Sequence, residues 1–87
     1  MGRELHSTRT FERLYKRLPK QIQDEAIEKL DLYLRDPSHP SLRVKRIRGT
    51  ERIWELTVTM QYRVTFEIDD EKIILRRIGT HDILKKR

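Results

Sequence analysis

The sequence has 87 residues, with 20 Lys and Arg against 14 Asp and Glu, and a net charge of +6. This length predicts a single small domain over residues 1–87, and the lack of cysteine excludes disulfides, thiolate zinc sites and a cysteine nucleophile. No stretch approaches the ~20 apolar residues of a membrane span, and the first ten residues lack the apolar core of a signal peptide, so we expect a cytoplasmic protein without a membrane partner.

Two amphipathic helices are predicted in the first half of the chain. Residues 9–18 carry four apolar side chains at the i, i+3, i+4 and i+7 spacing of one helical face, after an N-cap at Ser7 or Thr8. Pro19 interrupts this helix and suits the first position of a second one over residues 20–34, so the two helices form a hairpin. The inward side chains expected on the second helix are Ile22, Ala26, Ile27, Leu30, Tyr33 and Leu34.

Strands are predicted after a loop that contains two prolines. Residues 53–60 and 62–68 alternate between apolar and polar side chains, as half-buried antiparallel strands do. Residues 72–78 include three consecutive apolar residues, which indicates a strand buried on both faces. Residues 44–48 alternate poorly and predict an irregular edge strand, and residues 3–6 predict a short further strand.

These elements predict an α+β fold in which an N-terminal helical hairpin packs on one face of a small, mostly antiparallel sheet. In residues 54–68 the even-numbered positions, Met60 included, are expected to face the helices. The odd-numbered positions then form a polar opposite face. That face carries Glu55, Thr57, Arg63, Thr65 and Glu67.

Basic residues concentrate in the second half of the chain. Residues 1–41 contain 8 basic and 7 acidic residues, whereas residues 42–87 contain 12 and 7. The basic groups that stand out are Arg43, Lys45, Arg46 and Arg48, and then Lys85, Lys86 and Arg87. Such clustering favours a polyanionic partner such as a nucleic acid. The alternatives are a solubilising surface and a surface for an acidic protein.

Two side chains suit chemistry on phosphate groups. Arg63, between apolar strand neighbours, offers a rigid planar donor fork for a phosphate; the alternative is a cross-strand ion pair with Glu55 or Glu67. His81 follows the last predicted strand in a Gly-Thr-His-Asp segment, and imidazoles suit proton transfer because they ordinarily titrate near neutral pH. Asp82 is expected to orient His81 or to pair with a basic residue elsewhere.

Other chemistries find no matching pattern in the sequence. Three scattered histidines do not make a metal site, and three widely separated glycines do not make a phosphate-binding loop. No serine has the local context of a nucleophile in a Ser-His-Asp triad. We therefore expect neither a metal ion nor a cofactor.

Four short blocks, in this order, resemble the RelE/ParE superfamily of bacterial and archaeal toxins from toxin–antitoxin pairs. The blocks are HPSLRVKRIRG at residues 39–49, Trp54-Glu55-Leu56, Tyr62-Arg63-Val64, and Ile78-Gly79-Thr80-His81-Asp82. The resemblance covers almost the whole chain. It implies a microbial-RNase-like α+β fold, usually a ribosome-dependent, metal-independent endoribonuclease that cuts messenger RNA, and an antitoxin encoded alongside that wraps the toxin.

The resemblance also implies roles for individual residues. The Gly-Thr-His segment is most similar to the YafQ-like branch, in which the histidine helps catalysis, so His81 is expected to act as general acid or base. Arg63 would stabilise the transition state, and His39 is a second catalytic candidate. The residues expected to hold the RNA backbone are Arg43, Lys45, Arg46, Arg48 and Lys85.

The chain departs from the family pattern at two places. Glu55 and Thr57 stand where RelE-type members carry lysines, and residues 83–85 contain no aromatic side chain where many members stack one on a base. Three functions therefore stay open: mRNA cleavage on the ribosome, ParE-like inhibition of DNA gyrase without catalysis, and a diverged RNA- or antitoxin-binding module without toxicity. A toxin–antitoxin hetero-oligomer is expected for a toxin of either kind.

Overall fold

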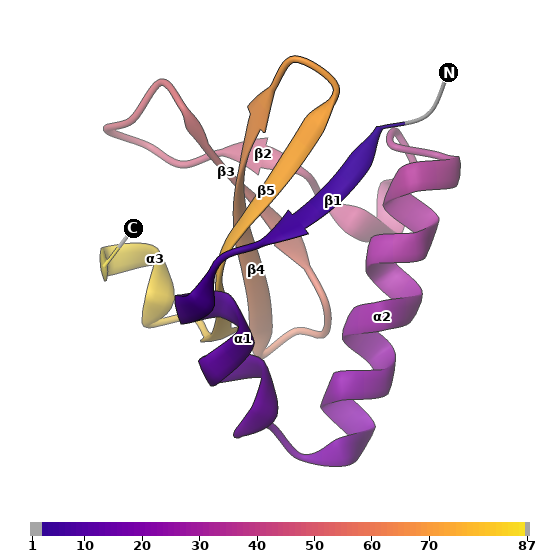
Figure 1. Cartoon of the computed structure of the whole chain (residues 1–87), viewed down its shortest axis with the longest axis vertical. Coiled ribbons are helices and arrows are strands. Elements are labelled where there is room, and N and C mark those ends of the chain that lie inside the picture. Colours follow the sequence, from indigo (N-terminus) through magenta and orange to yellow (C-terminus); the bar gives the residue numbers. More distant parts are fainter. Residues whose placement is uncertain (1–2, 87) are drawn as a thin grey trace.

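The computed structural model describes residues 3–86, which fold into a five-stranded sheet with two helices packed on it (Figure 1). None of the helices it describes is both long and apolar enough to span a bilayer. In chain order the elements are β1 (Glu4–Ser7), α1 (Arg9–Lys16), α2 (Lys20–Arg35), the 3₁₀ helix η1 (Pro40–Leu42), β2 (Lys45–Arg46), β3 (Ile53–Thr57), β4 (Tyr62–Asp69), β5 (Lys72–Thr80) and α3 (Ile83–Lys86).

A strand precedes the helical hairpin, so the prediction that the hairpin is N-terminal was wrong. The short strand expected near residues 3–6 is present as β1, and it lies in parallel beside β5, the last strand of the chain (Figure 1). β1 gives hydrogen-bond partners to one backbone edge of β5, which would otherwise be exposed. It also brings Leu5, opposite Ile73, against the core.

The strand order is β1-β5-β4-β3-β2, and every pairing except that of β1 with β5 is antiparallel. β5 is therefore an interior strand, as its apolar run predicted, and β2 is the short edge strand predicted from residues 44–48. The ladder between β4 and β5 shifts at one point, where Thr65 pairs with Arg77 but Phe66 pairs with Leu75. Arg76 is the extra residue of this β-bulge.

The helical hairpin forms where the sequence predicted it. The side chain of Thr8 accepts a hydrogen bond from the Phe11 N–H and caps α1. Pro19 is the N-cap of α2 rather than its first residue. The Gln23 side chain donates a 2.8 Å hydrogen bond to the Tyr15 carbonyl and ties the two helices together.

The core lies between the helices and one face of the sheet. The rings of Tyr33 in α2 and Phe66 in β4 lie 5.3 Å apart, and the even-numbered positions of β3 and β4 face the helices as predicted. Met60 is the exception, because it lies in the β3–β4 turn and is 91% exposed. On α2, Ile27 and Leu34 are also exposed rather than inward. The core side chains are Phe11, Ala26, Leu30, Tyr33, Leu42, Leu56, Val58, Val64, Phe66, Ile73, Leu75 and Ile78.

Candidate functional site

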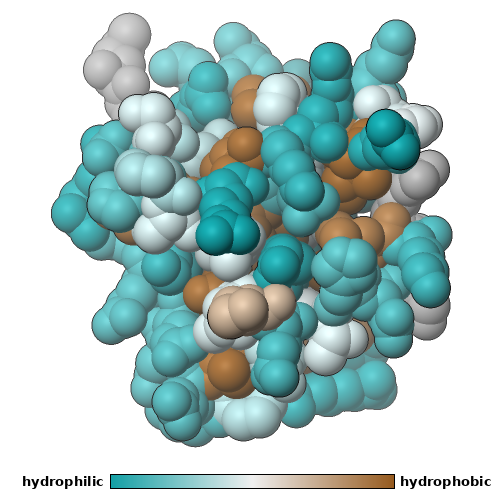
Figure 2. Space-filling model, turned by 180° about the vertical axis from the view of Figure 1, so that it is seen from behind, coloured by the Kyte–Doolittle hydropathy of each residue, from teal (hydrophilic) through white to brown (hydrophobic). Residues whose placement is uncertain are grey.

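A hollow of about 320 Å³ gathers residues from four separate segments of the chain. The predicted polar face of β3 and β4 supplies its floor, and the segments before β2 and after β5 supply its rim. We call it the basic hollow. Its lining consists of Arg43, Val44, Lys45, Glu55, Thr57, Arg63 and His81. The side of the molecule turned away in Figure 1 is mainly hydrophilic, with hydrophobic residues only in scattered patches (Figure 2).

The floor of the basic hollow is an ion pair between neighbouring strands. Glu55 is buried and Arg63 half-buried, and the Arg63 Nε lies 3.7 Å from the Glu55 Oε1. The cross-strand ion pair that the sequence offered as the alternative for Arg63 is thus present. Thr57, directly opposite Arg63 in the ladder, completes the floor.

Arg63 also holds the β3–β4 turn. Its Nη1 donates hydrogen bonds to the carbonyls of Thr59, Met60 and Tyr62. These contacts and the Glu55 pair fix the plane of the guanidinium before any ligand arrives. A planar donor fixed in this way presents its remaining N–H groups to a phosphate at little cost in side-chain entropy.

The rim of the basic hollow is exposed and cationic. Arg43 ends η1 with a positive φ of 46°, which turns the chain toward β2 and places Arg43 and Lys45 on the same hollow. His81 lies in the turn after β5, also exposed. The tertiary structure thus joins His81 to Arg63 and to two of the cations that the sequence singled out.

Several other predicted site residues lie outside the lining of this hollow. His39 caps η1, where its Nδ1 accepts a 3.2 Å hydrogen bond from the Ser41 N–H. The Arg46 guanidinium lies over the Trp54 ring, 5.8 Å from its centroid. Both contacts are local and explain these side chains without a ligand.

Asp82 follows His81 in the same turn but lines a separate depression, which lies next to α1. Arg48 lies in the β2–β3 connection and Lys85 in α3, and both are exposed. The side chain of Lys86 and the whole of Arg87 lie outside the described residues. In the part of the chain that the structure describes, no three His, Asp or Glu side chains are grouped so that they could hold a metal ion.

From the sequence, Glu55 was named as an alternative ion-pair partner for Arg63 and as a departure from lysine, but it was missed as a site residue. Its odd-numbered position places it on the polar face of β3. Glu55 is nevertheless only 6% exposed. A buried carboxylate in a hollow rich in cations is a common arrangement for acid–base chemistry. The signal in the sequence was the odd-numbered pair of Glu55 and Arg63 on adjacent strands.

Comparisons with known proteins place this chain in a family. The family model described as the ParE toxin of the type II toxin–antitoxin system parDE matches residues 6–84. No curated protein sequence matches the chain.

Solved structures share the fold at low sequence identity. The RelB–RelE complex from Methanococcus jannaschii matches with a TM-score of 0.74 and 20% identity, over 93% of this chain and 95% of the other. The E. coli DinJ–YafQ complex matches with a TM-score of 0.79 and 13% identity, over 97% and 98%. The Mycobacterium tuberculosis RelBE2 complex matches with a TM-score of 0.74 and 22% identity, over 93% and 100%. The chain therefore belongs to the ParE toxin family of type II toxin–antitoxin systems, and it shares its fold with RelE and YafQ.

Proposed function

We propose that this toxin is a metal-independent endoribonuclease that cleaves messenger RNA on the ribosome, in the cytoplasm. The observation that carries the proposal is the basic hollow, where His81 meets Arg63, Glu55 and two exposed cations. A histidine, a carboxylate and fixed guanidinium groups can supply the proton transfers and the charge stabilisation that phosphodiester cleavage without a metal requires.

The chemistry assigns one role to each group. Cleavage begins when the ribose 2′-hydroxyl loses its proton and attacks the adjacent phosphorus, and it ends when the 5′-oxygen leaves with a proton. Glu55 takes the 2′-hydroxyl proton, and His81 donates the proton to the leaving oxygen. Arg63, Arg43 and Lys45 stabilise the charge that develops on the phosphate oxygens.

The matched test compares two histidines. His81→Ala is expected to lower the rate of mRNA cleavage on purified translating ribosomes by ~10²-fold or more, because it removes the proton donor. His39→Ala makes the same chemical change outside the basic hollow and is expected to cleave at the wild-type rate. Undiminished cleavage by His81→Ala, or equal losses in both variants, would overturn the assignment.

We also propose a cognate antitoxin as partner, in a toxin–antitoxin hetero-oligomer. The M. jannaschii and E. coli neighbours are complexes of this kind. An apolar groove of about 370 Å³ opens between β1, α1 and α2, and it exposes more than half of the Ile27 side chain. A segment that folds on binding needs such apolar surface to offset its ordering entropy. The other apolar lining residues are Leu5, Phe11, Tyr15, Leu30 and Leu75.

The antitoxin proposal is tested with the small acidic reading frame expected next to this gene. Co-purification of its product with the wild-type toxin is expected, and Ile27→Asp is expected to abolish it because a charge would be buried in the groove. Leu34→Asp introduces the same charge at another exposed apolar position of α2 and is the control. Complex formation that survives Ile27→Asp would exclude the groove as the binding site.

A second candidate function is inhibition of DNA gyrase, as in ParE-like toxins. The observation that favours it is the family model, which is the ParE model. This function uses protein contacts and needs no catalytic histidine. It predicts that the purified toxin inhibits gyrase supercoiling and that His81→Ala inhibits equally well, with messenger RNA left intact.

A further inference from the structure

The two helices of the hairpin carry opposite charge patterns. Residues 9–17, which form α1 and its C-cap, contain four cations and one carboxylate, whereas residues 20–35 of α2 contain three cations and four carboxylates. The net charge of the first half of the sequence is therefore near zero because a basic helix and a mildly acidic helix partly cancel.

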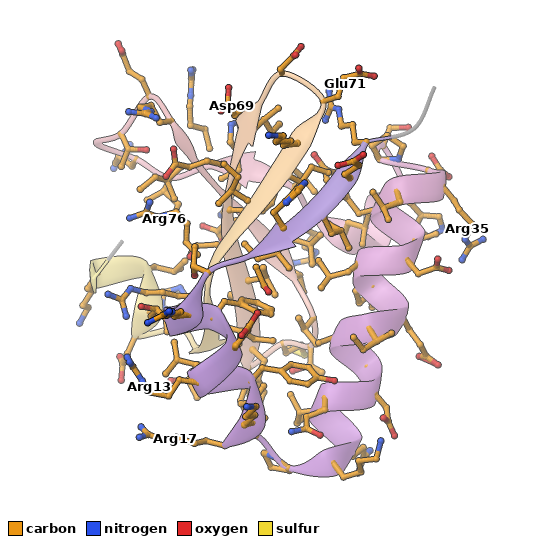
Figure 3. All side chains as sticks on the ribbon, in the orientation of Figure 1. Arg13, Arg17, Arg35, Asp69, Glu71 and Arg76 are labelled. Atoms are coloured by element: carbon orange, nitrogen blue, oxygen red, sulfur yellow. The ribbon has the colours of Figure 1, made fainter. Side chains whose placement is uncertain are left out.

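The cations of α1 occupy one exposed face. Arg9, Arg13 and Arg17 follow each other at i, i+4 and i+8, about 6 Å apart along the helix axis. All three are exposed, as is Lys16 beside them, and this face is opposite the apolar face that packs on the sheet. Arg13 and Arg17 project away from the sheet (Figure 3). We call Arg9, Arg13 and Arg17 the arginine stripe.

Within the described residues no carboxylate forms an ion pair with the arginine stripe, although Asp82 lines the same depression as Arg17. The one acidic residue of α1, Glu12, accepts a hydrogen bond from Ser7 instead. The cations of α2 differ, since Lys20 pairs with Asp24 and Arg35 with Asp31. The charge and hydrogen bond of Asp24 raise the pKa of Lys20 above its ordinary value.

Helix stability alone does not account for the stripe. Cations near the C-terminal end of a helix are favoured by its dipole, which explains Arg13 and Arg17. Arg9, however, is the first residue of α1, where the same dipole disfavours a cation. An uncompensated charge at that position needs another reason.

We propose that the arginine stripe binds the sugar–phosphate backbone of double-helical RNA, as a second RNA surface outside the basic hollow. The choice of RNA as the polyanion rests on the proposed function. Arginine forks match phosphate oxygens, and a phosphate backbone needs only unpaired cations on its partner. An acidic peptide fits this surface less well, because a segment that folds on binding needs apolar anchors along its length, and of the stripe it is Arg17, at one end, that lines a depression with apolar residues.

The surroundings of the stripe favour paired over single-stranded RNA. Proteins that bind single strands stack the bases on exposed aromatic rings. The two aromatic side chains of α1 face away from the stripe: Phe11 is buried, and Tyr15 lines the apolar groove on the other side. A rigid helix with evenly spaced cations instead suits the regular phosphates of a duplex whose bases are already stacked.

The experiment compares two triple variants with the same change in net charge. One is Arg9→Gln, Arg13→Gln and Arg17→Gln; the control, on α2, is Lys20→Gln, Lys29→Gln and Arg35→Gln. Binding of a labelled RNA duplex is followed by fluorescence anisotropy at several salt concentrations, and circular dichroism checks that both variants fold. The stripe variant is expected to bind about 10-fold more weakly, with a salt slope smaller by roughly 2 to 3, whereas the control keeps both values near wild type.

Three results would overturn the proposal. Equal losses in the two variants would mean that only net charge matters. An equal loss for a single-stranded RNA of the same length would remove the preference for duplex. A stripe variant that loses affinity for an acidic peptide but keeps its affinity for the duplex would assign the surface to a protein. Because binding is measured without cleavage, these outcomes are independent of the result with His81→Ala.

Discussion

The two faces of the sheet are both closed to solvent in the middle, but with different residues. On the face toward the helices, Leu56, Val64 and Phe66 are fully buried among other apolar side chains. On the opposite face, Glu55 and Thr65 are buried as well, and both are polar. The first face gains free energy from burial, whereas the second loses some of it by taking polar groups out of water.

This difference separates the part of the molecule that holds the fold from the part that carries the chemistry. Apolar burial needs no particular partner, so the helix face is explained by packing alone. A buried carboxylate is retained at a cost, and here it lies on the floor of the basic hollow beside Arg63. Substitutions on the two faces are therefore expected to affect different properties.

The largest effect is expected on the helix face. Phe66→Ala removes a fully buried ring that contacts Tyr33, and it is expected to lower the free energy of unfolding by about 3–5 kcal/mol. Urea unfolding followed by circular dichroism measures the loss. Met60→Ala, at an exposed turn position, is the control and should stay within about 0.5 kcal/mol of wild type. A Phe66 loss as small as that of Met60 would contradict the assigned core.

On the opposite face, Glu55→Gln should affect cleavage more than folding. Loss of the carboxylate is expected to lower mRNA cleavage by ~10²-fold, while the free energy of unfolding falls by only about 1 kcal/mol, because Arg63 keeps its three carbonyl acceptors. Glu67→Gln makes the same change on the same face, at a residue paired with Arg52 and Arg76. Cleavage by the Glu67 variant should be unchanged; a comparable loss there would assign the Glu55 effect to the face as a whole.

Thr65→Val is expected to stabilise the protein by about 1 kcal/mol. The Thr65 Oγ1 is buried and has no hydrogen-bond partner in the described structure, so its replacement by a methyl group removes a desolvation cost. Thr59→Val is the matched control and is expected to destabilise the protein, because the Thr59 Oγ1 accepts hydrogen bonds from the N–H groups of Gln61 and Tyr62. Thermal unfolding of both variants measures the effect, and a destabilised Thr65→Val would refute the cost assigned to this hydroxyl.

The smallest effect at neutral pH is expected for Tyr33→Phe, because the Tyr33 hydroxyl accepts a long, half-buried hydrogen bond, of 3.5 Å, from Arg3. Burial raises the pKa of Tyr33 above its ordinary value of 10.0, so the folded state favours the neutral phenol. The corresponding stability is complete below pH 10.0 and is lost as the pH rises through the folded pKa. Wild type should therefore lose more stability than Tyr33→Phe in urea titrations between about pH 8 and about pH 11. Identical pH profiles for wild type and Tyr33→Phe would argue against a raised pKa of the buried Tyr33 hydroxyl.

Local patterns in the sequence predicted most of the elements. Apolar spacing located the helical hairpin to within about two residues, because one face of each helix must meet the core. Strict alternation located β3 and β4 for the same reason. Met60 continued the alternation into a turn, where no partner strand remained to bury it. The alternation of apolar and polar residues does not show where a strand ends.

The place of β1 could not be read from its own residues. Four residues carry too little pattern to choose a partner strand, and β1 pairs with β5 across nearly seventy residues of sequence. Similarly, the bulge at Arg76 shifts the register of β5 without any local signal in the sequence.

The sequence by itself determined that this is a small basic α+β protein in which Arg63 and His81 are the residues best suited to phosphate chemistry. Only the tertiary structure decided that Glu55 joins them and that Asp82 and His39 line other surfaces. The reason is physical. Residue type and spacing fix which face a side chain takes, but burial and proximity depend on segments that meet only when the chain has folded.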